Sequence, residues 1–169
     1  ADYEKALTLL KTLLDQHPQN AFYWELKGQI LYESGKIKDS LYPYEQALKL
    51  KPNSPLFMLS LAQSLVGTEN KKYLRKAQIL LEKARDLEPD NINILYFLSV
   101  VYGREGSMGL MALTLAEKEG ILGNWVGVKE QAMRAMKHLK KGDRAYVRAE
   151  DLKRQAEREF NMATRTHKF

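Results

Sequence analysis

Prolines recur along this chain at a nearly constant interval. Pro18 and Pro52 are 34 residues apart, and Pro89 follows 37 residues after Pro52. The additional residues of the second interval fall in the polar stretch 68–72, where a loop accommodates them. Because proline cannot continue a helix and restrains the residue before it, each of these prolines is expected to separate two helices. A period of this length indicates a stack of similar helical units.

Small and aromatic residues occupy set positions between the prolines. The best copy of the pattern contains Trp24, Gly28, Gly35, Ser40, Tyr44, Ala47 and Pro52. This spacing is typical of the tetratricopeptide repeat (TPR), a pair of closely packed helices. We expect Gly28 and its equivalent Ala62 to let the two helices of a pair approach, and Tyr44 with Ala47 to interlock with the next pair. These residues therefore build the scaffold.

The pattern predicts an all-α protein, an α-solenoid of tetratricopeptide-type helix-turn-helix repeats with a C-terminal capping helix. We expect a single domain over residues 1–169. Its predicted parts are a lone second helix of a truncated repeat (1–18), three repeats (21–54, 55–91 and 92–120), a degenerate helix pair (121–142), the capping helix (143–161) and a tail (162–169). Since the chain lacks an initiating Met and enters a helix at once, we interpret it as a piece of a longer protein.

The excess of positive charge lies at the C-terminal end. Through residue 126 the chain has fifteen Lys or Arg and fifteen Asp or Glu, whereas residues 127–169 contain twelve and six. We interpret this end as a solvated helix face, or as a docking surface for an acidic protein or anionic lipid headgroups. Nucleic acid is not expected as a partner, because Trp125 and Tyr146 are the only aromatic residues between 123 and 158. The predicted basic surface comprises Lys137, Lys140, Lys141, Arg144 and Arg148.

No residue pattern that carries catalysis or metal binding occurs in the sequence. Cysteine is absent, and His17, His138 and His167 are too scattered for an HExxH zinc motif. Neither a glycine-rich phosphate loop nor a nucleophile elbow is found. We therefore expect no catalytic site, no metal and no cofactor in this chain. The longest apolar run, 94–102, is shorter than the roughly 20 residues that span a bilayer, so no transmembrane segment is expected.

Three strings are more specific than the repeat around them. They are Glu25-Leu26-Lys27-Gly28-Gln29, Val101-Tyr102-Gly103-Arg104-Glu105-Gly106 leading into Ala112-Leu113-Thr114-Leu115-Ala116-Glu117, and Lys129-Glu130-Gln131-Ala132 with the stretch that follows to Asp151-Leu152. Over about residues 22–157 the chain resembles the C-terminal tail of BepA-like bacterial envelope zinc metallopeptidases. Those enzymes join an HExxH protease domain to tetratricopeptide repeats.

The resemblance implies a parent protein that is a zinc metallopeptidase, with its zinc in a protease domain that this chain lacks. It implies a non-catalytic protein-binding tail that docks partners of the outer-membrane assembly machinery or presents clients. The location would be the periplasm of a Gram-negative bacterium, peripheral to the membrane. The alternative is a free-standing TPR adaptor or scaffold, cytoplasmic or in the envelope, without a protease. An HExxH helix encoded upstream of Ala1 would favour the first interpretation, and an immediate start codon the second.

A protein partner is expected in the concave face, which the first helices of stacked pairs line. The groove positions of tetratricopeptide repeats, carried over by offset, are Phe22, Glu25, Gln29, Tyr32, Glu33, Leu56, Leu59, Gln63, Asn93, Tyr96, Val100 and Arg104. The alternative is that several of them pack against neighbouring helices or the C-terminal cap. A clamp for a C-terminal carboxylate is not expected, because anionic oxygens need charge-assisted donors and this set contains few cations.

We predict that the isolated chain holds no stoichiometric zinc and has no proteolytic activity. The reason is that it contains no cysteine and no pair of histidines at the spacing of zinc ligands. Elemental analysis after dialysis and a protease assay would check this. Zinc retained in a one-to-one ratio with the chain would contradict the prediction.

Overall fold

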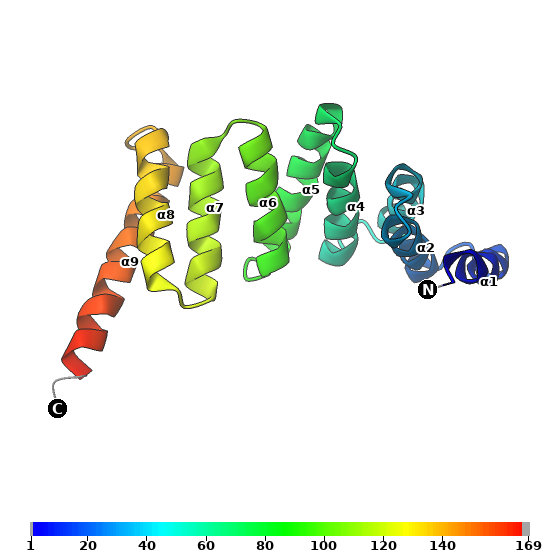
Figure 1. The fold of residues 1–169 in the computed structure, drawn as a ribbon, viewed down its shortest axis with the longest axis horizontal. Helices are drawn as coiled ribbons and strands as arrows, with labels where there is room; N and C mark the ends of the chain where they lie inside the picture. The colour runs from blue at the N-terminus through cyan, green and yellow to red at the C-terminus, as the bar shows by residue number, and fades with distance from the viewer. Residues whose placement is uncertain (1, 167–169) are drawn as a thin grey trace. The chain divides into compact units, whose positions relative to one another are not determined.

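The computed structural model describes the backbone of residues 2–166 and the side chains of residues 2–162. Within this range the chain forms nine α-helices, one short 3-10 helix and no strand (Figure 1), which confirms the all-α prediction. The elements are α1 (Tyr3–Gln16), α2 (Ala21–Glu33), α3 (Ile37–Leu50), α4 (Pro55–Gly67), η1 (Lys71–Tyr73), α5 (Leu74–Leu87), α6 (Ile92–Arg104), α7 (Met108–Ile121), α8 (Trp125–His138) and α9 (Arg144–Thr166).

The residue two positions after each repeat proline caps the next helix. Asn20, Ser54 and Asn91 precede α2, α4 and α6. Their side-chain oxygens accept hydrogen bonds from backbone N–H groups of the first turn at 3.0, 3.3 and 3.1 Å. Each such cap contributes about 1 kcal/mol, because it satisfies a donor that has no partner within the helix. Proline and cap together set the start of the first helix in every repeat.

Helices approach closely where the sequence places small residues. An ideal Cβ built on Gly28 of α2 would lie 2.6 Å from the ring of Tyr44 in α3, so the ring fills the space that a larger residue would need. Ala62 of α4 is completely buried. The hydroxyl groups of Ser40 and Ser64 form a buried hydrogen bond of 2.8 Å between α3 and α4. The close approach predicted at Gly28 is therefore present.

The helices divide into two compact units, Ala1–Pro89 and Asp90–Phe169, although the sequence predicts one domain. In unit 1, α2 packs against α3 and α4 packs against α5, while α3 joins the two pairs and α1 packs on α2. In unit 2, α6 packs on α7, and α8 packs on both α7 and α9. None of the helices between residues 2 and 166 combines the length and apolar character that a membrane crossing requires.

The C-terminal part differs from the sequence prediction. Segment 121–142, predicted as a degenerate helix pair, contains one helix, α8, because the turn at Gly123 (φ +71°) ends α7 and α8 begins directly after it. Ala132 and Ala135 of α8 share a buried cluster with Ala149 and Ala156 of α9, so α9 is the partner of α8. This helix is the predicted capping helix 143–161, but it continues to Thr166, since no proline or glycine interrupts it. Residues 167–169 of the predicted tail, including His167, lie outside the described residues.

We predict that Gly28→Ala lowers the free energy of unfolding by about 1–3 kcal/mol, because the new methyl group collides with the Tyr44 ring. Chemical denaturation would measure the change. Gly120→Ala is the matched control, since its Cβ would meet Val128 at an ordinary 3.7 Å and alanine favours a helix by about 1 kcal/mol over glycine. Equal stability of the two variants would show that Gly28 is not a point of close approach.

Candidate functional site

Eight of the predicted groove residues lie on α2 and α4 of unit 1. The spacing of Phe22, Glu25, Gln29 and Glu33 places them along one side of α2. Between neighbouring helix pairs, the Ser60 hydroxyl of α4 donates a hydrogen bond of 3.4 Å to Glu25 Oε1 of α2. We call these eight residues the α2–α4 face: Phe22, Glu25, Gln29, Tyr32, Glu33, Leu56, Leu59 and Gln63.

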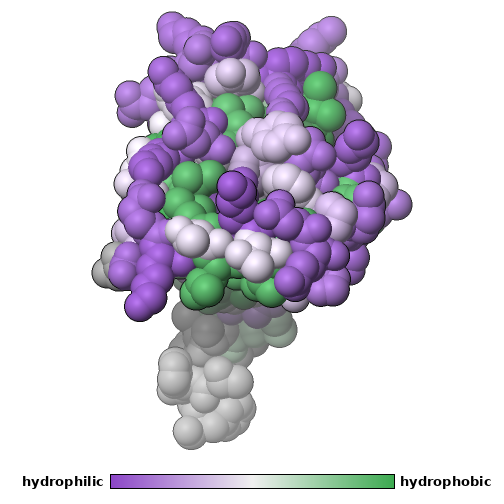
Figure 2. Space-filling view, turned by 90° about the vertical axis from the view of Figure 1, so that its right-hand side faces the viewer, coloured by the Kyte–Doolittle hydropathy of each residue, from purple (hydrophilic) through white to green (hydrophobic). Residues whose placement is uncertain are grey.

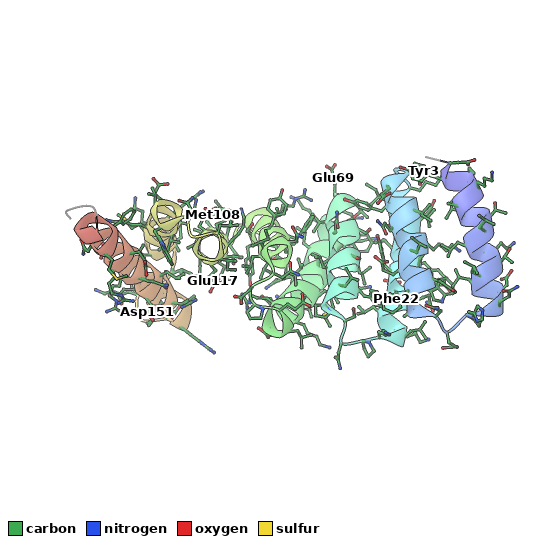
Figure 3. The ribbon with its side chains drawn as sticks, turned by 90° about the horizontal axis from the view of Figure 1, so that it is seen from below. Tyr3, Phe22, Glu69, Met108, Glu117 and Asp151 are labelled. Carbon is green, nitrogen blue, oxygen red and sulfur yellow. The ribbon has the colours of Figure 1, made fainter. Side chains whose placement is uncertain are left out.

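Apolar side chains of this face remain accessible. Phe22 and Leu56 are 53% and 51% exposed, and Leu59 is half-buried. Phe22 contacts the buried ring of Phe57 edge-on, with ring centroids 5.4 Å apart. Lys51 Nζ lies 4.4 Å from the centroid of the Phe22 ring. Phe22, labelled in Figure 3, thus contacts two neighbouring side chains while about half of its surface stays open to solvent.

A shallow depression of about 580 Å³ adjoins Phe22. It is lined by the turn between α1 and α2, residues 16–21, together with Phe22 and Lys51. Its wall has both apolar atoms and the Lys51 ammonium group. The depression adjoins the α2–α4 face, and its turn residues are not among the groove positions predicted from the sequence. The feature of the sequence that indicates it is the polar turn at Pro18.

The carboxylate of Glu25 is half-buried within the face. Burial raises the pKa of Glu25 above its ordinary value, and the hydrogen bond from Ser60 counteracts part of the rise. Farther along α2, Gln29 Nε2 donates a hydrogen bond of 2.8 Å to Glu33 Oε1. Burial also raises the pKa of the Tyr44 hydroxyl, and the nearby Glu25 carboxylate acts in the same direction. The face therefore combines apolar groups with two carboxylates and amide donors.

Tyr32 is partly a packing residue. An ideal Cβ on Gly67 would lie 3.4 Å from both the Tyr32 ring and the side chain of Ile37, so these groups meet at the end of α4. The half-buried Tyr32 fits the alternative interpretation of the groove positions, in which some of them support neighbouring helices.

The remaining groove positions lie on α6 in unit 2. Asn93, Tyr96 and Arg104 are exposed and Val100 is half-buried. Tyr96, 49% exposed, contacts the ring of Phe97 edge-on at a centroid distance of 5.2 Å. These residues make up the α6 face, which belongs to a different compact unit from the α2–α4 face.

A further apolar surface, not identified from the sequence, lies on α1. Figure 2 looks onto the side of unit 1 that carries α1 and shows apolar side chains between polar ones. The exposed large apolar residues of α1 are Leu9, 64% exposed, and Leu13. Leu9 and Leu13 each stand one position before a buried residue, Leu10 or Leu14. They therefore form a second apolar stripe that can be recognised in the sequence of α1.

Four of the five predicted basic residues form one exposed group around the turn between α8 and α9. Lys137, Lys140, Lys141 and Arg144 make no ion pair within the described part of the chain. Arg148 differs, because its Nε lies 3.3 Å from the Glu117 carboxylate of α7. Within residues 2–166 no group of three or more His, Cys, Asp or Glu is arranged to hold a metal ion.

Residues 2–112 match the family model described as the cytochrome c-type biogenesis protein H TPR domain. The chain belongs to this family. A relative named cytochrome c-type biogenesis protein CycH, from Rhizobium meliloti (strain 1021), is 29% identical over 90 residues, which are 53% of this chain. The match covers only 24% of that relative's length.

Solved structures with low sequence identity have the same fold. A crystal structure of MamA is 19% identical, with a TM-score of 0.68 over 96% of this chain and 92% of that chain. YrrB, described as a TPR protein with an unusual peptide-binding site, is 15% identical, with a TM-score of 0.67 over 99% of this chain and 84% of its own. These similarities confirm the predicted solenoid of tetratricopeptide repeats. Neither the family nor the CycH relative points to a metallopeptidase parent.

We predict that Glu25→Gln raises the melting temperature at neutral pH, because the uncharged amide avoids the cost of a half-buried carboxylate. The gain should shrink as the pH falls. Above the raised pKa the native carboxyl group is charged and carries this cost, whereas below about 4.5 it is protonated in both the native and the unfolded chain. Thermal unfolding across this pH range measures the effect.

The control for the loss of one negative charge is Glu33→Gln, an exposed position on the same helix. A Glu25→Gln variant that is less stable than the native chain at neutral pH would contradict the prediction.

Proposed function

We propose that this chain is a non-catalytic protein-binding domain whose partner is a polypeptide involved in cytochrome c-type biogenesis. The family match and the name of the CycH relative support this setting. The tetratricopeptide solenoid supports protein binding, since stacked repeats present extended binding surfaces. The proposal also includes a periplasmic location.

The α2–α4 face is the observation that carries the binding proposal. It exposes Phe22 and Leu56 next to the half-buried Leu59, and anchors of this kind concentrate binding energy. The half-buried Glu25 and the exposed Gln29 supply polar groups among them. A polypeptide segment with apolar side chains and backbone or cationic donors fits this composition. The same composition, without Lys or Arg at these positions, does not favour capture of a C-terminal carboxylate.

A second setting is the C-terminal tail of a periplasmic zinc metallopeptidase that docks partners of outer-membrane assembly. The observation in its favour is the set of strings around Glu25, Val101 and Lys129. In this setting the zinc belongs to a protease domain outside the chain. The comparisons favour a TPR domain of the cytochrome c biogenesis family instead. The coding sequence on either side of this chain distinguishes the two, because the metallopeptidase setting requires an HExxH helix upstream.

We predict that Phe22→Ala combined with Leu56→Ala weakens partner binding at least ten-fold, because truncating buried anchors at an interface costs more than about 1.4 kcal/mol. The partner is first isolated by cross-linking the chain in an envelope extract of the source organism and identified by mass spectrometry. Titration calorimetry with the purified partner then gives the affinities. The loss should persist at high salt, since apolar contacts are not screened.

Ile79→Ala combined with Leu87→Ala is the matched control, because both residues are exposed and apolar but lie on α5. A similar loss in both double variants would argue against the α2–α4 face. Partners that all belong to outer-membrane assembly, with none from cytochrome c-type biogenesis, would overturn the proposed setting.

A further inference from the structure

Some Lys and Arg side chains of unit 2 form an ion pair with a carboxylate, and others do not. The paired cations each lie 3.9 Å or less from a carboxylate, and they are Lys118, Lys129, Arg148, Lys153 and Arg154. Four cations without an ion pair in the described residues lie around the connection between α8 and α9: Lys137, Lys140, Lys141 and Arg144. We call these four the basic turn. Arg134 and Arg158 are also unpaired but lie away from the connection.

The basic turn is held in place by the core of unit 2. Leu139 packs on α7 so closely that a Cβ on Gly109 would lie 2.7 Å from its side chain. The backbone N–H of Asp143 donates a hydrogen bond of 3.1 Å to the carbonyl oxygen of Lys140. Gly142 completes the turn with a φ of +91°, which other residues rarely adopt. The charged side chains therefore project from a fixed backbone.

Interaction with the helix dipoles explains the position of Lys137 but not that of Arg144. A cation near a helix C-terminus is favourable, which accounts for Lys137 in the last turn of α8. Arg144, in contrast, is the first residue of α9, whose first turn contains no acidic residue. A cation at that end opposes the helix dipole. Asp143 is the only carboxylate between residues 137 and 144, so the four like charges also repel one another.

We propose that the basic turn docks the protein on an anionic lipid surface. An external layer of negative charge compensates both the mutual repulsion and the unfavourable position of Arg144. The only large apolar side chain between residues 137 and 144, Leu139, is packed against α7, so the turn itself offers no exposed apolar anchor. Exposed lysines on flexible stems suit headgroups that have no fixed geometry. Each basic residue close to such a surface strengthens binding roughly five-fold.

The test is co-sedimentation of the chain with vesicles. One set consists of phosphatidylcholine, and the other contains equal parts of phosphatidylcholine and phosphatidylglycerol. The native chain should bind only the anionic vesicles, and binding should fall as salt shortens the screening length from about 10 Å at 0.1 M to about 3 Å at 1 M. Lys137→Gln, Lys140→Gln and Lys141→Gln together should weaken binding about 100-fold.

The control triple is Lys11→Gln, Lys38→Gln and Lys49→Gln, which changes the net charge equally at exposed, unpaired positions of α1 and α3. It should bind within about two-fold of the native chain, since scattered charges do not reach one surface together. An equal loss in both triples would reduce the effect to net charge and overturn the proposal. Absence of binding to anionic vesicles, with binding to polyglutamate instead, would assign the basic turn to an acidic protein partner. Circular dichroism verifies that both triples are folded.

Discussion

Close packing of small residues against large ones is the contact on which the rest of this structure depends. Tyr44 fills the space beside Gly28, and Leu139 fills the space beside Gly109, at distances that leave no room for a Cβ. The close approach of α2 and α3 at Gly28 therefore depends on side-chain size. Because interiors are packed to near-crystalline density, a methyl group added at these positions requires the neighbouring side chain to move. The exposed faces keep fixed geometry for the same reason.

The residues that pack the helices against one another are largely different from the residues exposed on the outer faces. Buried alanines and leucines satisfy the packing of each unit, so the outward positions of the first helices are free to carry binding chemistry. In unit 1 these positions combine apolar groups with carboxylates, whereas in unit 2 the connection of α8 and α9 is strongly basic. Two surfaces of such different composition suit two different partners. The first is the surface proposed above for a polypeptide segment, and the second is the one proposed for an anionic surface.

Several charged residues occupy positions that contribute little to the stability of the fold or reduce it. Arg148 lies beside Glu117, and an exposed pair of this kind contributes little to stability. Arg144, one turn earlier on α9, stands at the unfavourable end of a helix dipole. Glu25 likewise keeps a half-buried carboxylate that an apolar residue would avoid. Departures from local rules of this sort concentrate where a surface serves another molecule.

The sequence alone determined the helical class, the repeat period and the close approach at Gly28, because these depend on local backbone constraints and residue size. Proline and the cap residue two positions later act within a few residues of each helix start. The tertiary structure decided that 121–142 holds one helix, that Tyr32 packs beside Gly67, and that Glu25 meets Ser60. It also decided that Arg148 is paired while Arg144 is not. The contacts of Glu25 with Ser60 and of Arg148 with Glu117 join residues 35 and 31 positions apart, and such partners are fixed only when the helices pack.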